Sequence, residues 1–219
     1  NYLNLLNNQQ RKAVENIYGP TLVLAGAGSG KTRVLIFKIL HLLVNRLALP
    51  NQILAVTFTN KAAQEMKSRV TSLLNYPIDK MWLGTFHSLS AKILRSHYDL
   101  VGLKSNFIII DTDDQLKLIK QICEHLNIDI KDKPPKYFAK VIDNYKNKGI
   151  FPESVKNNKD EAIKKVYKLY QEELIRLNIT DFGDLILYCL KIFINNEKIR
   201  KKYQNLFKFI LVDEYQDIN

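Results

Sequence analysis

Short apolar runs alternate with helix-like periods along much of the chain. Four of them, rich in β-branched residues, cover Thr21–Ala25, Ile53–Phe58, Trp82–Phe86 and Phe209–Val212. Continuous apolar runs of this length are typical of strands buried on both faces of a parallel sheet. The pattern therefore predicts an α/β fold with helices on the faces of a parallel sheet.

A helix-like period separates the second run from the third. We expect a helix over Asn60–Leu74 with Thr59 or Asn60 as its N-cap. Its apolar residues recur at helical spacing and share one face, which comprises Ala63, Met66, Val70, Leu73 and Leu74.

From about Leu89 the pattern becomes mostly helical and richer in lysine. Asp111–Asp114 can cap a helix, Pro134-Pro135 interrupts the chain, and Phe107–Ile110 is compatible with a strand or a buried turn. Two more amphipathic helices are expected over Ala162–Leu177 and Asp184–Ile194. We therefore expect a sheet-containing lobe of residues 1–88, an inserted helical lobe of residues 89–203, and the first lobe again in residues 204–219.

Composition narrows the class of protein. With 219 residues, 46% hydrophobic and 25% charged, the chain is typical of a soluble globular protein. It lacks a signal-peptide pattern and any apolar run near the roughly 18 residues of a membrane span, so we expect a cytoplasmic protein without membrane contact. Cys123 and Cys189 match no metal-binding spacing and are expected to be small buried thiols.

The formal net charge of +11 favours a polyanionic partner. An A+T-rich coding sequence produces the same excess of lysine without selection for binding, so charge alone leaves this open. Lysine outnumbers arginine, which favours sequence-independent contacts with phosphates over the reading of base edges.

The stretch LAGAGSGKT, residues 24–32, lies between an expected strand and an expected helix. Glycines let successive backbone N–H groups face a polyphosphate, and the helix that follows presents its positive N-terminus. We expect the ammonium of Lys31 to bridge the outer phosphates and the hydroxyl of Thr32 to hold Mg²⁺. The chain has Ala25 where the common phosphate-loop pattern has glycine. The residues expected to cradle the nucleotide are Ala27, Gly28, Ser29, Gly30, Lys31 and Thr32.

The last apolar run ends in an acidic pair, Asp213 and Glu214. A carboxylate at the end of a neighbouring strand suits the Mg²⁺ of a nucleotide site, and a second acid can orient or deprotonate an attacking water. Together with the glycine loop, this pair predicts nucleotide hydrolysis rather than phosphotransfer.

Six stretches resemble, in the same order, the Q motif and motifs I, Ia, Ib, Id and II of UvrD/Rep/PcrA-type superfamily 1 DNA helicases. They are LNNQQRKAV (Leu6–Val14), AGAGSGKTRVL (Ala25–Leu35), VTFTNKAAQEM (Val56–Met66), GTFHS (Gly84–Ser88), TDFGDL (Thr180–Leu185) and LVDEYQD (Leu211–Asp217). Alanine at position 25 is usual in that family. The resemblance implies a RecA-like P-loop lobe with an inserted helical lobe, ATP hydrolysis with Mg²⁺, and 3′-to-5′ translocation on single-stranded DNA in repair or replication.

The resemblance also implies roles for individual residues. Gln10 would read the adenine edge, Arg33 would lie near the nucleotide, and Gln216 would sense the γ-phosphate or couple it to DNA. Residues that would border single-stranded DNA or a junction between single and double strands are Phe58, Asn60, Thr85, Phe86 and His87. Phe58 and Phe86 end expected strands, where an aromatic face can stack on any base, whereas a plain core aromatic is the alternative for Phe58. We expect Trp82 to serve packing.

Three other interpretations stay open. The chain is also compatible with a helicase subunit of a RecB/AddA-type nuclease, with a P-loop NTPase that acts on a substrate other than nucleic acid, and with a binding module whose nucleotide site is degenerate. Motifs III to VI and a second RecA-like lobe with its arginines are not in this sequence. We therefore expect the second lobe of the same full-length chain as a partner, and little unwinding or ATP turnover by residues 1–219 alone.

Overall fold

The computed structural model describes residues 2–155 and 161–217, and the chain divides into two compact units. The first unit comprises residues 1–89 and 201–219, and the second unit comprises residues 90–200, where the sequence had suggested an inserted lobe of residues 89–203. The chain leaves the first unit within α4 (Phe86–Ser96) and returns to it within α9 (Glu197–Leu206).

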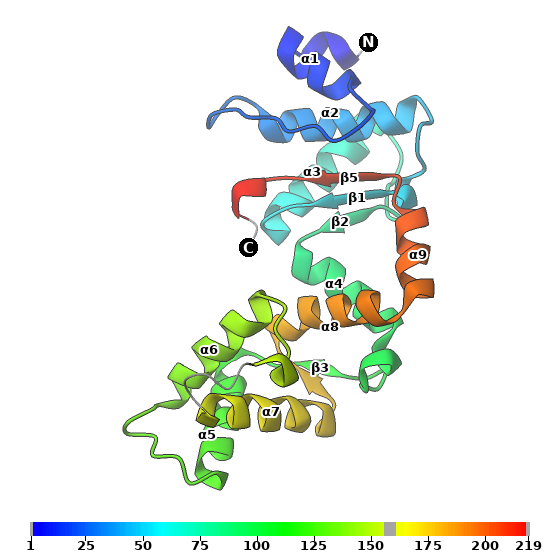
Figure 1. The fold of residues 1–219 in the computed structure, drawn as a ribbon. Coiled ribbons are helices and arrows are strands. Elements are labelled where there is room, and N and C mark those ends of the chain that lie inside the picture. Colours follow the sequence, from blue (N-terminus) through cyan, green and yellow to red (C-terminus); the bar gives the residue numbers. More distant parts are fainter. Residues whose placement is uncertain (1, 156–160, 218–219) are drawn as a thin grey trace. The chain divides into compact units, whose positions relative to one another are not determined.

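The first unit contains a three-stranded parallel sheet, with β1 between β2 and β5 (Figure 1). Its strands are β1 (Ile53–Val56), β2 (Trp82–Gly84) and β5 (Phe209–Val212). Ile53 and Ala55 of the central strand are almost completely buried. The predicted α/β class with a parallel sheet is thus confirmed.

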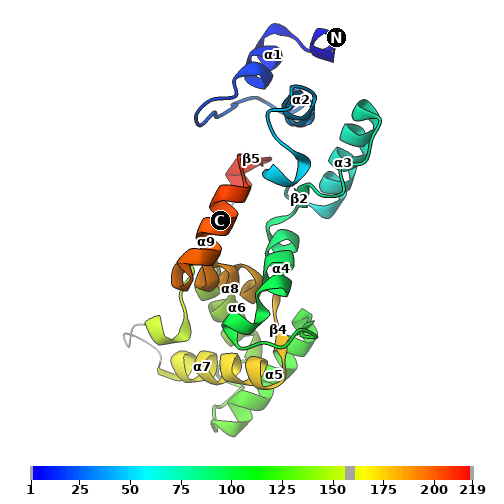
Figure 2. The ribbon, with the colours of Figure 1, turned by 90° about the vertical axis from the view of Figure 1, so that its right-hand side faces the viewer.

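Helices cover this sheet and form the apolar core of the first unit together with it. The described helices of the unit before β2 are η1 (Tyr2–Leu5), α1 (Asn8–Glu15), α2 (Lys31–Val44), η2 (Pro50–Gln52) and α3 (Asn60–Leu74). α1 packs on α2, and α2 packs on α3 (Figures 1 and 2). Ile36, Ile39 and Leu42 of α2 meet Met66 and Val70 of α3 in one apolar cluster.

The predicted helix over Asn60–Leu74 is confirmed, with Thr59 as the N-cap whose side chain accepts a hydrogen bond from the Ala62 N–H at 3.1 Å. The expected apolar face was too long, because Leu73 in the last turn is exposed. The helix ends directly afterwards at Asn75, which adopts a left-handed conformation.

The predicted strand over Thr21–Ala25 is wrong. This segment has no strand pairing, and Leu22 and Leu24 are 68% and 85% exposed. A strand requires a hydrogen-bonding neighbour. Among the described residues, β5 pairs with β1 along one edge and no strand pairs with its other edge. The apolar pattern therefore identified a segment suited to a sheet, but the described part of the chain supplies no strand beside it.

Two other predicted strands were too long at their C-terminal ends. β1 ends at Val56 rather than Phe58, and β2 ends at Gly84 rather than Phe86, which begins α4. Thr57 and Thr59 redirect the chain, because the Thr57 hydroxyl donates to the Thr59 carbonyl at 3.0 Å and Thr59 caps α3. Phe58 therefore lies in the turn after the strand.

The second unit is mostly helical. Its described elements beyond α4 are η3 (Tyr98–Val101), β3 (Ile108–Ile109), α5 (Thr112–His125), α6 (Pro135–Asn147), η4 (Pro152–Ser154), α7 (Glu161–Arg176), β4 (Ile179–Thr180) and α8 (Phe182–Asn195). β3 and β4 form a short parallel pair, so the segment over Phe107–Ile110 contains a strand.

The sequence predicted α5, α7 and α8 of this unit. It did not predict α6, because Pro134-Pro135 was expected to interrupt the chain, whereas Pro135 is the first residue of that helix, a position that proline tolerates. Asp111 caps α5 by accepting from the Asp114 N–H at 2.9 Å. α7 agrees with the predicted helix to within one residue at each end, and α8 begins earlier than predicted because Asp181 is its N-cap. Cys123 and Cys189 are both buried thiols, as expected.

None of the helices in residues 2–155 and 161–217 is long and apolar enough to cross a membrane.

Candidate active site

The glycine loop joins the exposed segment 21–25 to α2. Gly28 and Gly30 have φ angles of 74° and 87°, in the left-handed region that favours glycine. The Ser29 N–H and hydroxyl both bond the Gly26 carbonyl, at 3.3 and 2.6 Å, which closes a tight turn. Gly30 is the N-cap of α2, so the first-turn N–H groups of a 14-residue helix begin at this loop. The arrangement suits a bound phosphate.

Lys31 folds back over the loop. Its ammonium donates to the carbonyls of Ala25 and Gly26, at 3.0 and 3.3 Å. Both acceptors are neutral, and a phosphate oxygen accepts a stronger, charge-assisted hydrogen bond. Thr32 follows as the second residue of α2 and is half-buried.

The acidic pair follows β5 directly. The Asp213 N–H extends the pairing of β5 with β1 by donating to the Val56 carbonyl at 2.9 Å. Glu214 has a φ angle of 48°, a left-handed conformation that costs a residue with a Cβ about 1–2 kcal/mol. Gln216 lies in η5 (Tyr215–Asp217), and its side-chain amide donates to the Glu214 carboxylate. Backbone strain such as that at Glu214 is typical of functional sites, and the sequence carries no signal for it.

The glycine loop and the acidic pair lie within electrostatic reach of each other. Burial raises the pKa of Asp213, and so does the Glu214 carboxylate, whereas a hydrogen bond from the Glu214 N–H and the charge of Lys31 lower it. Residues 31 and 213 are remote in sequence, yet the fold places them close enough for the charge of Lys31 to act on the Asp213 carboxylate.

The donor set at this place fits Mg²⁺ bound with a nucleotide. Within residues 2–155 and 161–217, no group of three or more His, Cys, Asp or Glu side chains forms a metal cluster. Mg²⁺ commonly binds through one or two protein oxygens together with phosphates and water, rather than in an all-protein cage. Thr32 and Asp213 offer a hydroxyl and a carboxylate of this kind.

Gln10 lies against the glycine loop. Its side-chain Nε2 donates to the Ser29 carbonyl at 3.0 Å, and its Oε1 accepts from the Asn7 N–H at 3.1 Å. Contact with Gly30 is close, because a Cβ at that residue would lie 2.7 Å from Nε2 of Gln10. A primary amide has a second N–H and a second lone pair, so Gln10 can still pair with an adenine edge. Arg33 is exposed and donates to the Leu5 carbonyl at 2.6 Å instead of reaching the loop.

The residues expected near DNA meet where β1 and β2 end. The Thr85 hydroxyl donates to the Asn60 side-chain oxygen at 3.4 Å, which joins the two segments. Phe58 is 65% exposed, so it is not a core aromatic, and Phe86 is exposed as well. Desolvation lowers the pKa of His87, which favours a neutral imidazole at pH 7. Ser88 lies in the stretch GTFHS but was given no role from sequence, and its hydroxyl and N–H both bond Thr85.

Trp82 serves packing, as expected. Its ring meets those of Tyr203 and Phe207 edge-on, with centroids 5.8 and 5.3 Å apart.

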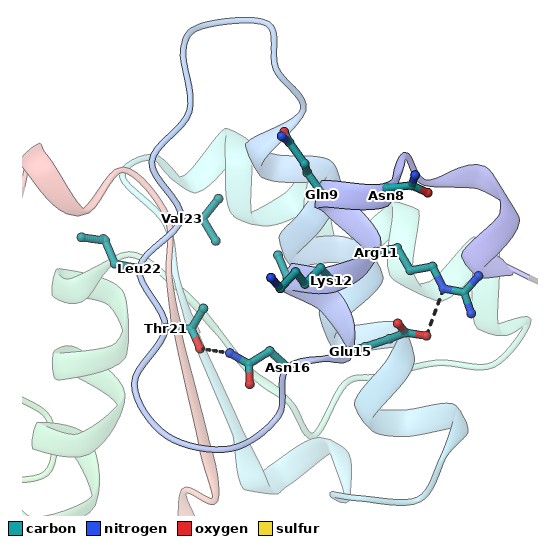
Figure 3. A pocket seen from close by; sticks show the side chains of 10 residues that line it. Asn8, Gln9, Arg11, Lys12, Glu15, Asn16, Thr21, Leu22 and Val23 are labelled. Carbon is teal, nitrogen blue, oxygen red and sulfur yellow. Dashed lines mark hydrogen bonds and ion pairs between the residues drawn. The ribbon is translucent and has the colours of Figure 1, made fainter.

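A groove of about 760 Å³ lies between α1 and the segment 21–23 (Figure 3). Arg11 pairs with Glu15 at its edge, and the Asn16 amide donates to Thr21 at 3.0 Å across it. None of the residues expected to bind nucleotide or DNA lines this groove. Its apolar wall is Leu22 and Val23, from the segment that was wrongly predicted to be a strand.

The stretch TDFGDL forms a buried polar cluster in the second unit, a role that its sequence does not reveal. Lys146, with a side chain 0% exposed, bonds Asp181 at 2.6 Å and Asp184 at 2.8 Å. Tyr170 donates to Asp181 at 2.8 Å, and Gln171 donates to Asp184 at 2.7 Å. Lys146 could not be found from sequence, because it comes from another helix.

Burial and charge oppose each other in this cluster. Burial alone would lower the pKa of Lys146, but the two carboxylates together raise it above its ordinary value. Burial raises the pKa of Asp184 to about 6, against the opposing effect of Lys146.

Sequence comparison with known proteins identifies a helicase family for this chain. The family described as UvrD/REP helicase N-terminal domain matches residues 6–219. The chain is 46% identical over its whole length to a probable DNA helicase II homolog of Rickettsia felis, and covers 34% of that protein. It is 42% identical over 99% of its length to the ATP-dependent DNA helicase PcrA of Staphylococcus aureus, and covers 30% of it. The chain thus spans about a third of the length of these curated relatives.

Proposed function

Because the chain belongs to the UvrD/REP helicase family, whose N-terminal domain it matches, we propose that it carries the ATP-binding part of an ATP-dependent DNA helicase. The observation that supports this most strongly is that the charge of Lys31 in the glycine loop acts on the Asp213 carboxylate after β5 and opposes the rise that burial causes in its pKa. One MgATP can then interact with both segments. In this proposal the first unit is a RecA-like lobe and the second unit is its inserted helical lobe.

Binding of ATP begins with the phosphates. The backbone N–H groups of Ala27, Gly28 and Gly30 face them, Ser29 exchanges its bonds to the Gly26 carbonyl for phosphate oxygens, and Lys31 moves from its carbonyl acceptors to the outer phosphates. Gln10 pairs with the adenine edge while its amide keeps the bond to Ser29. Arg33, one residue beyond the loop threonine, would have to leave the Leu5 carbonyl to approach the nucleotide.

Hydrolysis requires a positioned water. Thr32 and Asp213 hold Mg²⁺, which when bound neutralises part of the phosphate charge. Glu214 orients the water and accepts its proton as the oxygen attacks the γ-phosphorus, the bond to the bridging oxygen breaks, and ADP and phosphate leave. Gln216 senses the γ-phosphate and couples it to DNA, and its bond to Glu214 supports this role.

Single-stranded DNA lies at the rim where β1 and β2 end. Phe58 and Phe86 stack on bases without regard to sequence, and Asn60, Thr85 and His87 border the backbone. The exposure of Phe58 supports this role. We propose translocation in the 3′-to-5′ direction, a preference for junctions of single and double strands, and a cytoplasmic role in DNA repair or replication. A second RecA-like lobe of the full-length chain supplies the arginine that stabilises the transition state.

The test measures the ATPase rate of the full-length protein with and without single-stranded DNA, for wild type, Lys31→Ala and Glu214→Gln. We expect stimulation by DNA in wild type and loss of turnover in both variants, with Lys12→Ala, an exposed α1 lysine, as the matched control. A rate indifferent to DNA favours an NTPase acting on another substrate. Absence of hydrolysis in the wild type favours a binding module.

A further inference from the structure

A buried lysine of α2 holds the end of α1. Lys38 is 9% exposed, and its ammonium donates to the carbonyls of Ala13 at 3.3 Å and Val14 at 3.0 Å, and also to the carbonyl of Asn16. An ammonium has three donors, and each has one of these carbonyls as its acceptor. The desolvation that lowers the pKa of Lys38 is therefore offset by a complete set of hydrogen bonds.

The acceptors of Lys38 are the carbonyls at the C-terminal end of α1. The last carbonyls of a helix have no partner within the helix and carry its negative dipole end, so a cation stabilises them. Lys38 stands seven residues after Lys31 on α2, which is about 10 Å further along the helix axis and nearly the same face. The helix that begins at the phosphate loop therefore also fixes α1.

α1 carries Gln10, the residue proposed to read adenine. Gln10 touches the loop through the Ser29 carbonyl, and Arg33 holds the Leu5 carbonyl ahead of α1. Both of those bonds are exposed, whereas the bond from Lys38 to Val14 is buried. Because exposed hydrogen bonds compete with water, the buried anchor at the far end of α1 contributes more to its placement than either of the two exposed bonds.

We propose that Lys38 is a positioning residue that holds α1, and with it Gln10, at the glycine loop, and so sets the preference for adenine nucleotides. The inference rests on the proposed function. The inference extends the proposed function, because Lys38 itself touches neither the nucleotide nor the glycine loop.

The test compares MgATP and MgGTP affinities of the full-length protein. GTP offers no adenine edge to Gln10, so its affinity reports the contacts that do not depend on that edge. In Lys38→Met we expect ATP affinity to fall about tenfold, GTP affinity to change less than twofold, and kcat at saturating ATP to stay within about twofold. In Lys38→Arg we expect the wild-type preference for ATP over GTP to be kept, since the guanidinium of arginine also donates hydrogen bonds to carbonyls. Lys12→Met, an exposed lysine of α1, keeps wild-type values.

A double variant identifies the route of the effect. If Lys38 acts through Gln10, Lys38→Met combined with Gln10→Ala binds ATP no more weakly than Gln10→Ala alone. Additive losses, or equal losses for ATP and GTP, overturn the proposal. Should Lys38→Met not fold, the same comparison in Lys38→Gln decides, because a glutamine amide has two donors in place of three.

The outcome also separates this inference from the proposed function. Absence of MgATP binding in the wild type refutes both. Loss of the adenine preference in Gln10→Ala, together with its retention in Lys38→Met, refutes only the role of Lys38.

Discussion

The two units each contain a pair of acids close in sequence, and they use them in opposite ways. In the second unit, Asp181 and Asp184 are buried and both bond Lys146. In the first unit, Asp213 and Glu214 are half-exposed, and Lys31 bonds two neutral carbonyls. Burial raises the pKa of Asp213, and the more distant charge of Lys31 opposes this rise only in part.

The difference shows what separates a structural acid pair from one suited to chemistry. The charges of the second unit neutralise one another inside the protein and leave little for a ligand to gain. Those of the first unit lie beside strained and left-handed backbone, at Glu214, Gly28 and Gly30, with acceptors that phosphate can replace. A site with strained backbone and replaceable acceptors is therefore stabilised when a ligand binds to it.

The sharpest way to break this comparison is to remove one charge from the charged cluster of each unit. Glu214→Gln removes the proposed base for the attacking water, so kcat should fall by about 10²- to 10⁴-fold while MgATP affinity is nearly unchanged. Steady-state ATPase rates and nucleotide titrations of the full-length protein measure both. A kcat within threefold of wild type would mean that Glu214 is not the base.

Lys146→Met removes the cation from the buried cluster. It leaves two carboxylates without their counter-ion, which should destabilise the second unit by about 3–5 kcal/mol. Hydrogen exchange of peptides from α6 and α8 reports the local opening free energy. The matched substitution Lys165→Met, at an exposed lysine of α7, should leave that protection nearly unchanged. Equal protection in both variants would contradict a structural role for the cluster.

An exposed phenylalanine of the first unit and a buried phenylalanine of the second allow the same contrast between function and structure. Phe58→Ala should weaken binding of single-stranded DNA by about 1–3 kcal/mol and leave nucleotide affinity intact, because the exposed ring can stack on a base. Fluorescence anisotropy with a labelled oligonucleotide measures the first quantity. Phe138→Ala, at a fully buried ring of the second unit, should instead lower stability. Equal loss of DNA and nucleotide affinity in Phe58→Ala would assign that ring to packing.

The smallest expected effect concerns pH. Because burial raises the pKa of Asp184 from 3.8 to about 6, its proton is bound more tightly in the folded state. That stabilisation is present at pH 3.8 and is lost as pH rises through about 6. Asp184→Asn cannot titrate, so its urea unfolding free energy relative to wild type should rise across this range by on the order of 1 kcal/mol. A pH-independent difference would show that Asp184 is ionised throughout.

Local patterns predicted most helices, because helical periodicity and capping depend on neighbours in sequence. Thr59, Asp111 and the run Asn60–Leu74 illustrate this. The segment Thr21–Ala25 could not be predicted in the same way, since a strand depends on a partner elsewhere in the chain.

The candidate site follows the same division. The glycine loop and the acidic pair could be found from short motifs, whereas their approach to each other depends on the fold. Lys146 and Lys38 had no local signal, because their partners come from other helices or from segments far away in sequence. The left-handed backbone at Glu214 also follows from tertiary structure.

The central claim is that the glycine loop and the acidic pair hold one magnesium-bound nucleotide. It is tested most directly by measuring how much Mg²⁺ strengthens ATP binding to the full-length protein, for wild type, Thr32→Val, Asp213→Asn and the double variant. If both residues hold the same ion, each substitution removes most of the gain from Mg²⁺, and the double variant loses no more than either alone. A full gain from Mg²⁺ in Asp213→Asn, or losses that add in the double variant, would contradict the account.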